Sequence, residues 1–176
     1  MVVDVQAGVM QECANAAQTI ANVARTVERA RAAQVPVIWV QHESDELKRD
    51  SDAWQWVPAL VPAAGEARVY KQFNSSFEQT NTDELLAQAG VSHIVLAGAQ
   101  SNWCIRATAY GALERGYDLT LVKDAHTTSD LDLGNGTRID AATIVRDLNV
   151  TMKWLQYPGR RNAVAAAEEV VFGATG

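Results

Sequence analysis

Residues 93–125 read "HIVLAGAQSNWCIRATAYGALERGYDLTLVKDA". The apolar runs at 93–98 and 118–125 are typical of buried strands, and residues 103–115 between them are predicted to form a helix. A strand, a helix and a second strand in this order indicate an α/β domain whose strands run parallel. The same stretch places Cys104 at the start of the helix, after a short turn of small residues.

The rest of the chain continues this alternation of strands and helices. Strands are expected at 1–5, 35–41 and 67–71, and helices at 14–33, 81–90 and 138–153. Residues 163–172, "AVAAAEEVVF", fit either a strand or a helix. Asn102 is the expected N-terminal cap of the helix at 103–115. Because the expected strands are apolar throughout rather than alternating, we expect helices on both faces of a parallel sheet.

Composition limits the classes of protein to consider. The chain has 176 residues, which fit one domain over 1–176. Its net charge is −6 and it holds no basic cluster, so neither nucleic acid nor a membrane surface is an expected partner. No apolar run reaches the roughly 20 residues of a membrane span, and no basic flank marks a signal peptide. Cys13 and Cys104 do not form a disulfide framework, so we expect a cytoplasmic protein.

Three polar residues fall on or near the carboxyl ends of expected strands, where ligands of parallel sheets gather. Asp4 lies within the first strand, Lys71 closes the third, and Cys104 follows the run at 93–98 by a short turn. A helix N-terminus and a nearby cation would both favour the thiolate form of Cys104. Together the three groups would supply a base, electrostatic support and a nucleophile.

Each of these residues also has a structural interpretation. Asp4 would be a buried carboxylate bonded to backbone amides, and Lys71 a solvated lysine at a strand end. Cys104 would be a small buried hydrophobic residue, as most free cysteines are. Cys13 is expected to be structural. The pattern of residues alone leaves both interpretations open.

Three separated segments carry a resemblance to a known family. "VVDVQAG" (2–8), "VYKQFNSSFEQTNTDELLAQAG" (69–90) and the stretch 93–125 resemble, in order and spacing, the isochorismatase-like cysteine hydrolase superfamily. That superfamily includes nicotinamidases, carbamoylsarcosine amidases and ureidoacrylate-type amidohydrolases. The resemblance implies a three-layer αβα sandwich with a mostly parallel, Rossmann-like sheet of about six strands.

The resemblance also implies the site. It assigns a catalytic triad to Asp4, Lys71 and Cys104, and the presence of the thiol favours amide-type chemistry. It implies a cis peptide bond between Ala99 and Gln100, in a turn that aims the backbone amides of Gln100 and Cys104 at one point as an oxyanion hole. In the expected reaction the thiol attacks a carbonyl carbon, and water then hydrolyses the thioester.

Nicotinamidases of the superfamily bind a metal through an Asp-x-His pair and a further histidine after the second strand. Here His42 is present in "VQHESDELKRD" (40–50), but no Asp-x-His follows, so we expect no metal and no other cofactor. Gln6, His42, Phe73 and Trp103 are the expected substrate-binding residues. The sequence does not indicate which substrate they bind.

The expected function is hydrolysis of a small amide or carbamoyl-type C–N bond through a thioester. The alternatives are a nicotinamidase-type amidase with a metal, and a non-catalytic binding domain on the same fold. We expect a small-molecule substrate. We also expect a homo-oligomer, because the superfamily commonly assembles and the loop at 51–60, with Trp54 and Trp56, offers apolar area.

Overall fold

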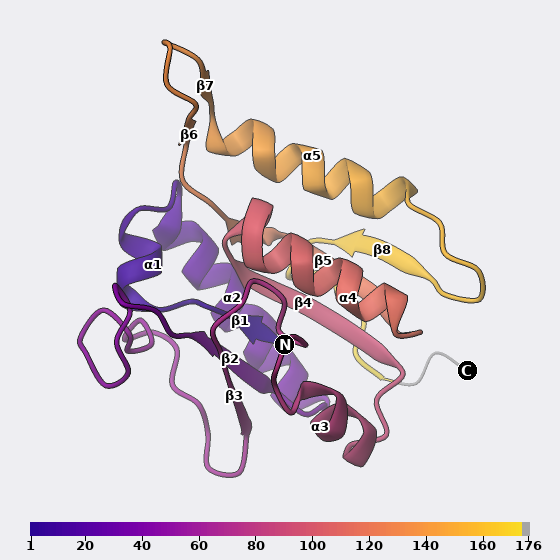
Figure 1. The fold of residues 1–176 in the computed structure, drawn as a ribbon. Coiled ribbons are helices and arrows are strands. Elements are labelled where there is room, and N and C mark those ends of the chain that lie inside the picture. The colour runs from indigo at the N-terminus through magenta and orange to yellow at the C-terminus, as the bar shows by residue number, and fades with distance from the viewer. Residues whose placement is uncertain (174–176) are drawn as a thin grey trace.

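The structure, a computed structural model, describes residues 1–173. A six-stranded sheet has the order β3-β2-β1-β4-β5-β8, and each neighbouring pair of strands is parallel (Figure 1). Its strands are β1 (Val2–Val3), β2 (Ile38–His42), β3 (Ala67–Lys71), β4 (His93–Ala99), β5 (Asp118–Thr127) and β8 (Asn162–Ala165). The expected parallel sheet of about six strands is confirmed.

Helices cover both faces of this sheet, so the three-layer arrangement is also confirmed (Figure 1). Val27 of α2 (Ala16–Ala32) packs in one core cluster with Val2 and Trp39, whereas Leu148 of α5 (Ala141–Trp154) packs in a second cluster with Val3. Adjacent strand residues enter opposite clusters because successive side chains point to opposite faces. The helices are α1 (Ala7–Gln11) and α2 (Ala16–Ala32) on one face, and α3 (Thr82–Gln88), α4 (Arg106–Glu114) and α5 (Ala141–Trp154) on the other.

Some elements differ from the expectation. The short helix α1 was not expected, and neither was the hairpin of β6 (Leu131–Asp132) and β7 (Arg138–Ile139). The ambiguous segment at 163–172 begins as strand β8 and then leaves the sheet. The guanidinium of Arg29 in α2 donates to the carbonyl oxygen of Val170 at 2.7 Å, which ties this last segment to the helix.

The helix that follows β4 begins with a wide turn. Residues Ser101–Ile105 form a π-helical turn, η1, which continues directly into α4. The expectation that Asn102 caps the helix is wrong, because Gln100 occupies the cap position and Asn102 lies inside the turn. The Asn102 side-chain oxygen instead accepts a hydrogen bond from the Thr128 hydroxyl at 2.6 Å. Turns of this kind often occur at functional sites.

The tryptophans of the loop at 51–60 pack inside the chain. Trp54 is buried and stacks on Tyr70 with ring centroids 5.8 Å apart. Trp56 meets Trp39 edge to face at 5.0 Å. Because Trp54 is buried and Trp56 partly buried, these two side chains supply little of the exposed apolar area expected for an assembly. A homo-oligomer stays a prediction without that support.

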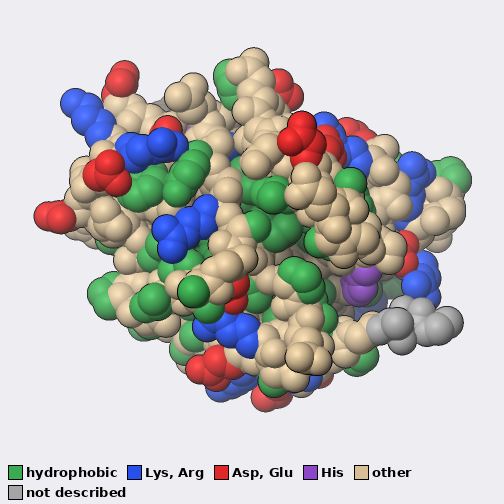
Figure 2. Space-filling view, turned by 90° about the horizontal axis from the view of Figure 1, so that it is seen from below, with side chains coloured by type: hydrophobic (Ala, Val, Ile, Leu, Met, Phe, Trp, Pro, Cys, Tyr) green, Lys and Arg blue, Asp and Glu red, His purple; other side chains and the backbone are tan. Residues whose placement is uncertain are grey.

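The surface carries charge of both signs. On the face shown in Figure 2, acidic and basic side chains lie interspersed around small groups of hydrophobic ones, without a continuous basic area. Within residues 1–173, no helix combines the length and the apolar character needed to cross a membrane.

The strand order creates a switch point in the sheet. The chain passes from β1 outward through β2 to β3, and then returns to place β4 on the other side of β1. Ligands of open parallel sheets bind at such a point, outside the carboxyl ends of the strands. Gly98 allows β1 and β4 to approach there, because a β-carbon at this residue would lie 1.9 Å from the Val3 carbonyl oxygen.

Candidate active site

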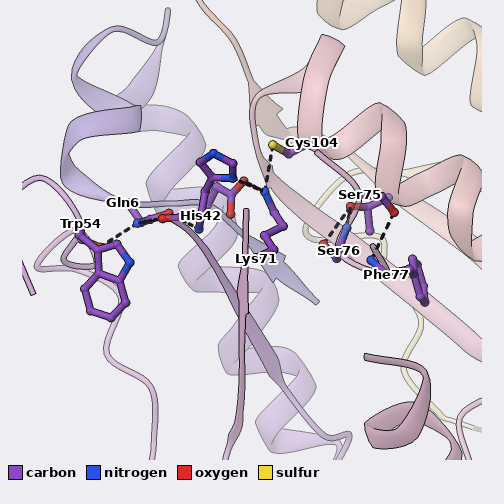
Figure 3. A network of polar contacts seen from close by, with 10 residues as sticks. Gln6, His42, Trp54, Lys71, Ser75, Ser76, Phe77 and Cys104 are labelled. Carbon is purple, nitrogen blue, oxygen red and sulfur yellow. Dashed lines mark hydrogen bonds and ion pairs between the residues drawn. The ribbon is translucent and has the colours of Figure 1, made fainter. Parts of the chain in front are cut away.

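The side chain of Lys71 lies at the centre of a buried polar cluster. Its ammonium nitrogen is 2.6 Å from Oδ2 of Asp4, 3.1 Å from Sγ of Cys104 and 3.1 Å from Nδ1 of His42. Figure 3 shows Cys104 and His42 on either side of the lysine. Each residue comes from the carboxyl end of a different strand: β1, β2, β3 and the turn after β4. The structure thus brings together the three groups of the expected triad and adds a histidine.

The cluster is almost entirely removed from solvent. The side chains of Lys71 and Asp4 are 0% and 2% exposed. Burial lowers the pKa of Lys71, but the Asp4 carboxylate and the Cys104 sulfur raise it by more, so the net shift is upward and the ammonium keeps its charge. The interpretation of Lys71 as a solvated strand-end lysine is therefore wrong.

Asp4 sits in an unusual backbone conformation directly after β1. Its φ is +53°, in the left-handed region that aspartate adopts more readily than most residues. Its amide donates to the carbonyl oxygen of Val40 at 2.9 Å, which continues the line of contacts between β1 and β2. Among residues 1–173, the carboxylate oxygens accept no hydrogen bond beyond the Lys71 ion pair. One oxygen is therefore available to a proton donor.

Cys104 is a thiol at rest rather than a thiolate. Burial is the largest cause and the Asp4 carboxylate the second, and together they raise the pKa of Cys104 to about 12 against the opposing effect of Lys71. This corrects the expectation that a helix start and a nearby cation favour the thiolate. The sulfur and a carboxylate oxygen of Asp4 lie within 4.8 Å of one another, so the thiol and the carboxylate are neighbours in the cluster.

His42, the last residue of β2, is neutral. Burial, followed by the charge of Lys71, lowers its pKa. Because an ammonium group only donates, Nδ1 of the imidazole accepts the Lys71 proton, and the proton of the neutral ring is therefore on Nε2. All three Lys71 protons thus have partners: Asp4, Cys104 and His42.

Gln6 holds this strand end in place. Its side-chain oxygen accepts from the His42 backbone amide at 2.8 Å, and its amide donates to the carbonyl oxygens of His42 and Trp54 at 3.1 and 3.0 Å (Figure 3). Gln6 is fully buried and does not line the cavity described below. The expectation that it binds substrate is wrong, because its polar atoms are already bonded to backbone.

The segment after Lys71 is fastened to α4. The Ser76 backbone amide donates to the Thr108 hydroxyl at 3.0 Å. The neighbouring Phe77 is buried and lies against Gly111, where a β-carbon would approach its ring to 3.0 Å. These contacts join the segment after β3, which carries Lys71, to α4, which follows Cys104.

A cavity of about 590 Å³ opens above the cluster. Asp4, His42 and Cys104 line its floor, and Trp103, 47% exposed, lines its mouth. The expected residue Phe73 does not line it, whereas the next residue, Asn74, does. The lining residues that the sequence did not single out are Gly8, Val9, Glu12, Ser44, Glu46, Leu47, Ala53 and Asn74. Only their position after strand ends could have indicated them.

The two residues expected to form an oxyanion hole, Gln100 and Cys104, both line this cavity. The Ala99–Gln100 peptide bond is cis, at the position that the resemblance indicates. The carbonyl oxygen of Gln100 accepts from the amides of Trp103 and Ile105, both at 3.1 Å, which holds the turn closed. The role of the two backbone amides stays a prediction.

Asp4, His42 and Cys104 offer three possible metal ligands within 4.8 Å of one another. The Lys71 ammonium contacts all three of these residues and already supplies a positive charge there. A divalent cation would be repelled by that charge at close range. The donor set therefore does not fit a metal centre.

A carboxylate, an ammonium and a thiol beneath a cavity are the groups of an α/β domain equipped for nucleophilic chemistry. Residues 1–144 match the family model of the isochorismatase domain. A secreted isochorismatase effector of Verticillium dahliae is 32% identical over 129 residues, which are 71% of this chain and 65% of that protein. A streptothricin hydrolase of Streptomyces noursei is 32% identical over 142 residues, which are 77% of this chain and 56% of that protein.

A solved structure agrees with these similarities. The crystal structure of an isochorismatase from Pseudomonas putida KT2440 is 27% identical, covers 95% of this chain and 86% of that chain, and has a TM-score of 0.84. The chain belongs to the isochorismatase family of hydrolases. It spans only 65% and 56% of the lengths of the two sequence relatives named above.

Proposed function

We propose that this protein hydrolyses a small amide or carbamoyl-type C–N bond through a thioester on Cys104. The observation that carries the proposal is the position of Lys71, whose buried ammonium contacts both Asp4 and Cys104 beneath an open cavity. A structural ion pair would need neither the thiol nor the cavity. The cluster therefore combines a proton acceptor, a fixed positive charge and a nucleophile.

The first half of the reaction forms the thioester. As Sγ of Cys104 attacks the carbonyl carbon, the Asp4 carboxylate takes the thiol proton. The backbone amides of Gln100 and Cys104 donate hydrogen bonds to the oxyanion. When the C–N bond breaks, Asp4 gives the proton to the departing amine. The high pKa of the resting thiol makes the transfer to Asp4 a necessary part of the attack.

The second half releases the acid. Asp4 removes a proton from a water molecule as its oxygen attacks the thioester carbonyl. The C–S bond then breaks, the proton returns to the sulfur, and a carboxylic acid leaves. Lys71 stabilises the negative charge on Asp4 in the resting enzyme and on sulfur during each step. His42 holds the ammonium between the two through its own hydrogen bond.

A panel of amides tests the proposal without a known substrate. Purified protein is assayed for release of ammonia or acid from primary amides, ureido acids and nicotinamide, beside the Cys104→Ala variant. Cys13→Ala is the matched control, because Cys13 is the second free cysteine and does not line the cavity. We expect turnover that Cys104→Ala abolishes and Cys13→Ala retains. Two results contradict the proposal: turnover that survives in Cys104→Ala, or a parent protein that hydrolyses no amide of the panel.

A further inference from the structure

Two exposed acidic residues line the cavity. Glu12 caps the end of α1, and Glu46 lies in the loop after β2; both are exposed and line the cavity. Within residues 1–173, neither side chain has a hydrogen-bond or ion-pair partner. Both carboxylates therefore add negative charge to the cavity lining, and no partner among the described residues offsets it.

Among residues 1–173, the Lys71 ammonium pairs with Asp4 beneath the cavity, but no basic side chain lines the cavity beside Glu12 and Glu46. Its lining contains Asp4, Glu12 and Glu46, but no lysine or arginine. Arg49, from the same loop as Glu46, is 2.5 Å from Glu43 and lies over the Tyr70 ring at 4.3 Å. Arg49 does not line the cavity.

One further feature, an exposed aromatic ring, fits a cation better than an anion. The indole of Trp103 is about half exposed at the mouth, and no ring or cation of residues 1–173 lies over it. The face of an aromatic ring attracts ammonium and guanidinium groups.

We infer that the substrate of this site carries a cationic group, an amine or a guanidinium, which Glu12, Glu46 and Trp103 bind while its carbonyl group reaches Cys104. This inference rests on the proposed function and names the class of substrate. An anionic acid amide would meet like charge at the mouth and receive no basic partner there. The net charge of −6 on the chain adds attraction for a cation at long range.

The first experiment measures charge selectivity at Cys104 itself and needs no substrate. In a Cys13→Ala background, the thiol is modified with methanethiosulfonates that carry an ammonium, a methyl or a sulfonate group. Each rate is divided by the rate of the same reagent with 2-mercaptoethanol. We expect the cationic reagent to be favoured over the anionic one by about tenfold at low salt, and by less at high salt.

Variants then assign the selectivity to the two glutamates. The double variant Glu12→Gln/Glu46→Gln should reduce the cation preference by at least about threefold. Glu114→Gln should leave it unchanged, because Glu114 is an exposed carboxylate at the end of α4 that does not line the cavity. The inference is overturned if Cys104 of the parent shows no preference for the cationic reagent, or if the double variant keeps that preference.

The second experiment uses three primary amides of matched length: β-alaninamide, butyramide and succinamate, which are cationic, neutral and anionic. We expect kcat/KM to fall in that order and the double variant to reduce only the cationic advantage. Hydrolysis that favours succinamate, or that ignores charge, overturns the inference but leaves the proposed function standing. If none of the reagents modifies Cys104, this result contradicts the proposed function and therefore also the inference. If none of the three amides is hydrolysed, the charge preference measured by modification of Cys104 decides whether the inference stands.

Discussion

The ammonium nitrogen of Lys71 lies 2.6 Å from Oδ2 of Asp4, in a place where both side chains are almost fully buried. Each charge is tolerated there because the other is present. The same nitrogen is 3.1 Å from Sγ of Cys104, so the ammonium that offsets the Asp4 charge would also stabilise negative charge on the sulfur in the proposed reaction. The stability of the protein and the chemistry of the site therefore depend on the same groups, and substitutions can measure each effect by itself.

Removing the lysine should destabilise the protein more than removing both charges. Lys71→Met leaves the Asp4 carboxylate buried without its partner, which should lower the free energy of unfolding by about 3–5 kcal/mol. Adding Asp4→Asn should recover part of that loss. Both proteins should be equally inactive, because the groups act as one unit. Denaturant unfolding of the two variants and the parent checks this, with Lys123→Met as an exposed control. A double variant less stable than Lys71→Met would contradict it.

His42 should act through Lys71 and be replaceable by a residue that keeps the acceptor. Asparagine places an oxygen near the position of Nδ1, whereas leucine removes the acceptor and leaves one ammonium proton without a partner. We expect His42→Leu to lower kcat by about 10- to 100-fold and His42→Asn by much less. Steady-state kinetics on the amide that the panel identifies compares them. Equal losses in the two variants would show that the imidazole does something other than hold Lys71.

His126 should make the protein sensitive to mild acid. Burial lowers its pKa from 6.5 to about 4, while its ring nitrogens contact the Ser101 hydroxyl at 2.8 Å and the Asn149 side-chain oxygen at 3.0 Å. Between these pH values the unfolded chain binds a proton at this residue and the folded protein does not. The free energy of unfolding should therefore fall as the pH decreases from 6.5 to about 4.

The control for this acid sensitivity is another histidine. Unfolding measured across this pH range should show a smaller decrease for His126→Gln than for the parent. His93→Gln should keep most of the decrease, since His93 is exposed at the start of β4, where its ring contacts the Thr120 hydroxyl. A His126→Gln protein with an unchanged slope would contradict the assignment.

The sheet and the three central residues of the site could be predicted from the sequence. The alternation of apolar runs and helices indicated the parallel sheet, and the rule that ligands gather at strand ends indicated that Asp4, Lys71 and Cys104 would meet. Gln6 and Phe73 could not be assigned correctly, because the sequence does not show which way a side chain points after a strand ends. The protonation of Cys104 was mispredicted because burial, its largest cause, is a property of packing.

Other features depend on structure that leaves little trace in the sequence. The helix α1 is five residues long and contains a glycine, so no periodic pattern marks it. Glu12 and Glu46 are 34 positions apart and lie in segments that resemble ordinary solvated surface. Only the fold brings both to one cavity.

The most direct test of the central claim is to trap the thioester on Cys104. The protein is mixed with the best amide of the panel in the presence of hydroxylamine, and the products and the acid-quenched protein are measured by mass spectrometry. We predict an acyl adduct that maps to Cys104, formation of the hydroxamate, and neither product with Asp4→Asn or Cys104→Ala. Amide hydrolysis that proceeds without any adduct or hydroxamate, or that persists in Cys104→Ala, would contradict the account.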